Sequence, residues 1–63
     1  MFEYAKIILP EVISSRELFQ KELIKCANWI EPKNLHKFQK WCYANFNEIY
    51  PDILEKELAY IAA

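Results

Sequence analysis

The chain has 63 residues, a formal net charge of −1, and no glycine. Glycine supplies the positive φ angles and close backbone approaches that hairpin turns, phosphate-cradling loops and dinucleotide-binding turns need, so its absence argues against all three. Hydrophobic residues make up 54% and aromatic residues 16% of the chain, which suits one small domain, residues 1–63, with a folded surface of about 4,300 Å².

The first apolar segment predicts a helix over residues 2–9. Its apolar residues recur at helical spacing, and the residue before Pro10 is disfavoured in the α region, so we expect the helix to end there. Residues 7–9 would also suit an extended strand, because β-branched side chains favour strands. No second strand candidate exists to pair with them, so we prefer the helix.

The second helix has the clearest start signal. Ser14 can cap the helix with Glu17 three residues later, a capping box, and Ile13 with Leu18 fits a hydrophobic staple. We predict a helix over residues 15–30. Its core stripe is Phe19, Leu23, Cys26, Ala27 and Ile30.

Two more helices are predicted over residues 33–47 and 51–62. Pro32 and Pro51 precede apolar-periodic stretches, and proline is favoured in the first turn of a helix because its missing N–H costs nothing there. The core stripe of the helix over residues 33–47 is Leu35, Phe38, Cys42, Phe46 and Ile49. The core stripe of the helix over residues 51–62 is Leu54, Leu58 and Ile61.

These elements predict an all-α fold, a compact bundle of about four short helices. We expect residues 15–30 and 33–47 to form a central antiparallel hairpin. In that hairpin Cys26 and Cys42 would be offset by roughly 7 to 8 Å along the helix axes, which disfavours a disulfide between them.

The side-chain inventory argues against an enzyme. Two cysteines and one histidine, with no close pair among them, do not match a structural zinc site. Cys26 and His36 project to different faces, and Glu55 and Glu57 point to different sides of one short helix. A chain this small leaves little room for a ligand pocket of about 300 Å³ or more. We therefore expect no catalysis, metal, cofactor or small-molecule ligand.

No apolar stretch approaches the roughly 18 to 20 residues that a membrane span requires. The opening residues also lack a basic leader followed by an apolar run. We therefore expect a cytoplasmic protein that does not bind membranes.

Apolar side chains left outside the core stripes predict a protein interface. Ile53 and Tyr60 project to the side of the last helix opposite its stripe, and Trp29 and Trp41 lie on the flanks of theirs. Aromatic residues in such positions are enriched at interfaces, although packing of the tryptophans in helix seams is an equally good explanation. The leading hypothesis is a non-catalytic interaction module that self-associates, as a homo-oligomer, or docks on a larger protein through these four residues.

A basic face offers the alternative, nucleic-acid binding in the manner of a helix-turn-helix. Lys33, Lys37 and Lys40 recur opposite the core stripe with His36 beside them, and residues 32–50 carry three lysines against one glutamate. The face lacks arginine for guanine contacts, and three lysines neutralise only about three phosphates. A row of lysines opposite a core stripe is more commonly just the solvent-facing side of an amphipathic helix.

Overall fold

The computed structural model describes residues 1–61 and confirms a small all-α bundle. It contains α1 (Phe2–Glu11), α2 (Arg16–Trp29), the short 3₁₀ turn η1 (Pro32–Asn34), α3 (Leu35–Phe46) and α4 (Pro51–Leu58). No strand occurs among these residues, so residues 7–9 are helical rather than extended.

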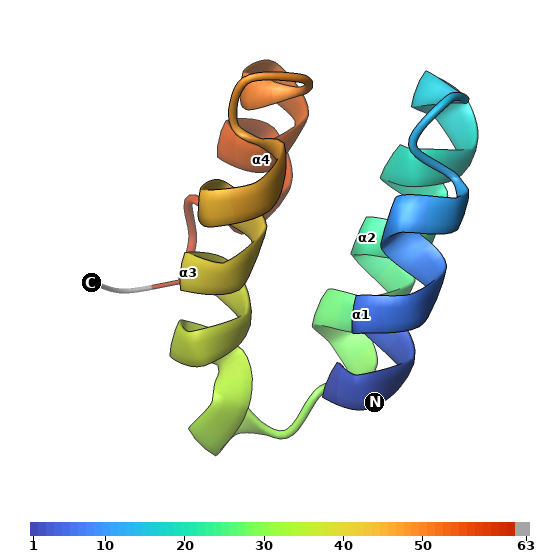
Figure 1. The fold of residues 1–63 in the computed structure, drawn as a ribbon. Helices are drawn as coiled ribbons and strands as arrows, with labels where there is room; N and C mark the ends of the chain where they lie inside the picture. The colour runs from blue at the N-terminus through green and yellow to red at the C-terminus, as the bar shows by residue number, and fades with distance from the viewer. Residues whose placement is uncertain (62–63) are drawn as a thin grey trace.

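Successive helices run in alternating directions, and the bundle is built as two helical hairpins that face each other (Figure 1). The closest backbone packing lies between α1 and α2, between α3 and α4, and then between α2 and α4. We call α1–α2 the first hairpin and α3–α4 the second hairpin. α2 and α3 run antiparallel, as expected for a central hairpin, but α2 packs more closely on α1 and α4 than on α3. The connection between α2 and α3 joins the two hairpins at one end of the molecule.

The core fills the space between the hairpins. Almost every residue of the predicted stripes is buried, and no polar or charged residue is buried among residues 1–61. Leu35 is partly buried. Ile49 is 51% exposed, because α3 ends at Phe46 and residues 47–49 turn away from the helical repeat. The accessible surface of 4224 Å² agrees with the area expected from mass.

The first helix extends two residues further than predicted, through Pro10 to Glu11. Pro10 lies in the last turn, where its missing N–H removes only one helical hydrogen bond. The next bond continues the helical pattern, with the Val12 N–H donating to the Ile8 carbonyl at 3.2 Å.

The second helix is capped by Ser15 rather than Ser14. The Ser15 backbone is extended, as an N-cap requires, and its Oγ accepts a hydrogen bond from the Leu18 N–H at 3.3 Å. This moves Glu17 out of the N3 position, so the predicted capping box does not form. Leu18 is exposed rather than stapled against Ile13.

The last two helices are shorter than predicted. Pro32 opens the turn η1 instead of α3, and α4 ends at Leu58; residue 62, the predicted end of α4, lies outside the described residues. The Gln39 side chain of α3 donates to the carbonyls of Leu58 and Ile61, at 3.0 and 3.2 Å. A side chain from a neighbouring helix thus satisfies carbonyls at a helix end in a chain that has no glycine to form a C-cap.

Candidate interaction surfaces

Ile53 does not lie on an exposed face of α4, contrary to the sequence-based expectation. It is only 2% exposed and belongs to the hydrophobic core. The reason is that α2 packs beside α4, where Gln20 donates to the Glu57 carboxylate at 2.9 Å and Arg16 pairs with Asp52. Two sides of α4 are therefore covered within the chain, and Ile53 has no surface to offer a partner in this fold.

Tyr60 is exposed, as expected, with 64% of its surface accessible. It follows the end of α4, so its position is set by the chain turn after Leu58 rather than by the helix. The Arg16–Asp52 and Gln20–Glu57 pairs align α2 with α4 in parallel. One further turn along α2 brings the exposed Ile24 toward the level of Tyr60.

Trp29 is the most exposed large apolar side chain among residues 1–61, at 71%. It ends α2 on the same helix face as Leu18, because the two residues are eleven positions apart, close to three turns. Lys25 also shares this face and lies 5.4 Å from the Tyr4 ring centroid, so the face borders α1.

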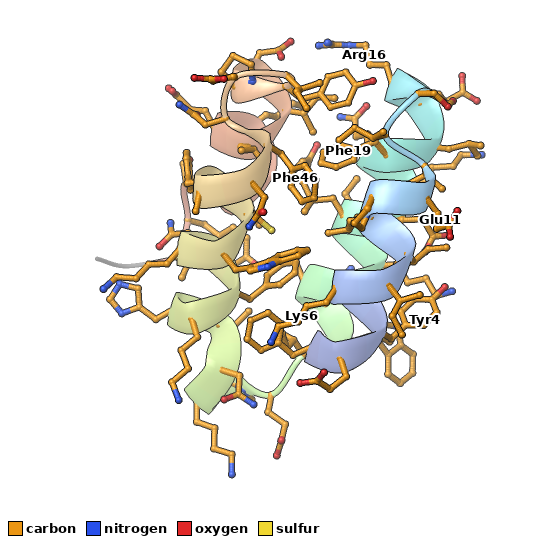
Figure 2. The ribbon with its side chains drawn as sticks, viewed as in Figure 1. Tyr4, Lys6, Glu11, Arg16, Phe19 and Phe46 are labelled. Carbon is orange, nitrogen blue, oxygen red and sulfur yellow. The ribbon has the colours of Figure 1, made fainter. Side chains whose placement is uncertain are left out.

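Further apolar side chains lie on the outer side of the first hairpin. Figure 2 shows Tyr4 on the side of α1 away from the second hairpin. Ile7 is 69% exposed and projects opposite the buried Ala5 and Leu9. We call the four exposed side chains Tyr4, Ile7, Leu18 and Trp29 of the first hairpin the outer patch. Sequence reasoning missed three of these residues, although the helical projection of Ile7 away from Ala5 and Leu9 already indicated an outward position.

Trp41 fills a seam between the hairpins instead of joining that patch. Its ring is half-buried and packs edge-on against Phe2 of α1, with centroids 6.2 Å apart, and against Phe46 at 5.3 Å. The two tryptophans therefore have different environments, and Trp29 is the one that is presented to solvent.

The basic face is fully exposed. Lys33 on η1 and His36, Lys37 and Lys40 on α3 are all accessible. None of them takes part in an ion pair within the described part of the chain. The sequence from Pro32 to Asn47 also contains no acidic residue, so the charged side chains of η1 and α3 are all basic.

The titratable core groups are two thiols. Burial raises the pKa of Cys42 to about 12 and, with a smaller contribution from the nearby Glu22, raises the pKa of Cys26. Both are free, protonated thiols at neutral pH and therefore poor nucleophiles. No cluster of three metal-ligating side chains occurs within residues 1–61, and no helix there is long and apolar enough to cross a membrane.

Two hollows lie on the surface formed by the described residues. One lies on the outside of α4 over Pro51, Asp52, Glu55 and Lys56, and another lies beside the end of α3. Neither brings together a nucleophile and a base, or the Cys26 and His36 side chains.

Comparisons with known proteins find no matching family model, no matching curated protein and no matching solved structure.

Proposed function

We propose that this chain is a non-catalytic protein-interaction module that binds a protein partner, or a second copy of itself, by burying the outer patch. The observation that carries the proposal is the exposure of Trp29 and Ile7 on a hairpin whose core side is already complete. These side chains add nothing to the interior.

The energetics favour such a role. Burying one large apolar side chain contributes about 1.5–3 kcal/mol, and tryptophan and tyrosine are the residues that most often dominate binding energy at interfaces. Trp29 and Tyr4, both exposed on the first hairpin, provide that kind of anchor. The exposed Tyr60 is a second and smaller contact in the proposal.

The test compares single substitutions on different surfaces. In sedimentation equilibrium, Trp29→Asp and Ile7→Asp should weaken self-association by about 10- to 100-fold, the equivalent of one buried apolar side chain. Ile49→Asp is the matched control, because Ile49 is a comparably exposed aliphatic residue on the second hairpin. If the partner is a different protein, it should bind to an affinity matrix that carries the wild-type chain or the Ile49→Asp variant. It should not bind to a matrix that carries Trp29→Asp or Ile7→Asp.

The proposal fails if two results are found together. These are a wild-type chain that stays monomeric at high concentration and the absence of any bound protein whose retention depends on Trp29.

A second candidate function is nucleic-acid binding through Lys33, His36, Lys37 and Lys40. It is supported by the exposure of all four side chains and the absence of acidic residues from Pro32 to Asn47. Binding would be weak and salt-dependent, with about three phosphates neutralised. Fluorescence anisotropy with a DNA duplex at about 50 mM salt tests it. Affinity should fall in the Lys37→Ala, Lys40→Ala variant and not in a Lys21→Ala, Lys56→Ala control; no detectable binding would exclude this candidate.

A further inference from the structure

Each hairpin buries its apolar side against the other. Phe2 of α1 meets Phe38 and Trp41 of α3, with centroids 5.9 and 6.2 Å apart. Phe19 of α2 meets Phe46 and Tyr50, at 5.1 and 4.8 Å. One hairpin without the other would therefore expose a large aromatic surface to water, which is strongly unfavourable.

A two-residue hinge joins the hairpins. Ile30 has φ −73° and ψ 146°, and Glu31 has φ −64° and ψ 139°, so both are extended. Pro32 keeps Glu31 out of the α region but leaves it the broad extended region, so different chain directions within that region stay open to Glu31. Ile30 belongs to the core at 6% exposed, whereas Glu31 is exposed. A change in chain direction therefore has to occur at Glu31, where it disturbs no packed side chain.

A polar cluster joins the two hairpins at the opposite end of the molecule. Arg16 pairs with the Asp52 carboxylate, and its guanidinium lies 5.7 Å from the Tyr50 ring centroid. The Tyr50 hydroxyl donates to the Ile13 carbonyl at 2.6 Å. We call these four residues the latch. Figure 2 shows Arg16 at the end of the bundle away from the hinge.

From this arrangement we infer that the first hairpin can accept the second hairpin of another copy of the chain, giving a dimer formed by hairpin exchange. In the exchanged dimer, the aromatic contacts and the latch contacts would form between two chains. Only the conformation of the hinge would differ from that in the monomer. The inference does not depend on the outer patch. A short linker gives the internal hairpin an effective concentration of the order of mM, so the closed monomer dominates in dilute solution.

The latch and the hinge should act differently on this exchange. The latch contacts are present in both the monomer and the exchanged dimer, and they are broken only while a chain is open. Arg16→Ala should therefore speed the interconversion and leave the equilibrium ratio of dimer to monomer unchanged. Deletion of Glu31 should shift that ratio toward the dimer, because a shortened hinge hinders closure within one chain.

The decisive experiment uses cysteines at a contact between the hairpins. Gln20→Cys and Glu57→Cys replace a hydrogen-bonded pair on α2 and α4. The variant is refolded at about 1 mM, near the expected effective concentration, and at about 10 µM. The size fractions are separated and treated with a short bismaleimide. Wild type is treated in parallel, since its buried thiols should not be cross-linked.

After refolding at high concentration, we expect a dimer fraction in which the cross-link joins two chains. In the monomer fraction, the cross-link should join two residues of the same chain. A dimer that cross-links only within each chain would overturn the inference, as would the absence of dimer from both wild type and the Glu31 deletion. Adding Trp29→Asp separates this result from the proposed function, since that change should dissolve a dimer held by the outer patch and leave an exchanged dimer intact.

Discussion

The Tyr50 hydroxyl donates a 2.6 Å hydrogen bond to the main-chain carbonyl of Ile13, and this contact ties the turn that precedes α4 to the turn that precedes α2. The Tyr50 ring also packs on Phe19 and lies under the Arg16 guanidinium. One aromatic side chain thus connects the ends of the two hairpins through a hydrogen bond, an aromatic contact and a cation–π contact.

Tyr50→Phe should lower the free energy of unfolding by about 1 kcal/mol, because it removes a hydrogen bond and leaves the Ile13 carbonyl without that donor. Urea denaturation followed by circular dichroism measures the change. Tyr60→Phe is the control, since the Tyr60 side chain is exposed and should tolerate loss of its hydroxyl. Equal midpoints for the two variants would contradict a structural role for the Tyr50 hydroxyl.

Ile53→Ala should cost about 2–5 kcal/mol, because it leaves a cavity in the core. Ile49→Ala makes the same chemical change at an exposed site and should stay within about 0.5 kcal/mol. Thermal or urea denaturation of the pair tests the placement of Ile53 inside the bundle. If Ile53→Ala were as mild as Ile49→Ala, the α4 face that carries Ile53 would be open to solvent after all.

Asp52 should make stability depend on acidic pH. Its hydrogen bond with Arg16 holds the pKa of the Asp52 carboxyl below its ordinary value of 3.8. A depressed folded-state pKa stabilises the fold above the unfolded-state pKa, and this contribution is lost as the pH falls through the folded-state value.

The difference in urea midpoint between wild type and Asp52→Asn should therefore be constant at neutral pH and shrink below about pH 4. Glu55→Gln, a neutralisation elsewhere on α4, is the matched control for the loss of one negative charge. A difference that stays constant down to about pH 2 would show that the Arg16–Asp52 pair does not form in solution.

The two tryptophans should report different environments in fluorescence. Trp41→Phe retains only the exposed Trp29 and should emit at long wavelength with strong quenching by iodide. Trp29→Phe retains only the half-buried Trp41 and should emit at shorter wavelength with weak quenching. If the proposed partner or a second copy covers the outer patch, its binding should shift the emission of the first variant and leave the second nearly unchanged.

Local features of the sequence were sufficient to predict four helices and most of their buried side chains. Proline restricts its own φ and its neighbour's conformation, and the spacing of Phe19 and Leu23, or of Leu54 and Leu58, defines a face of a helix without reference to anything else. The exposure of Lys37 and Lys40 followed from the same projection.

Tertiary packing decided the remaining features. A helical projection gives the direction of a side chain around its own axis, but it does not give the number of helices packed around that axis. Ile53 is buried because α2 packs against the second side of α4. Trp41 is partly covered because Phe2 of α1 packs against its ring. Trp29 projects to the flank of its core stripe, as Trp41 does, yet Trp29 stays exposed. Burial depends on neighbours that are distant in sequence, and only the folded arrangement of the two hairpins determines which of these side chains remain available to a partner.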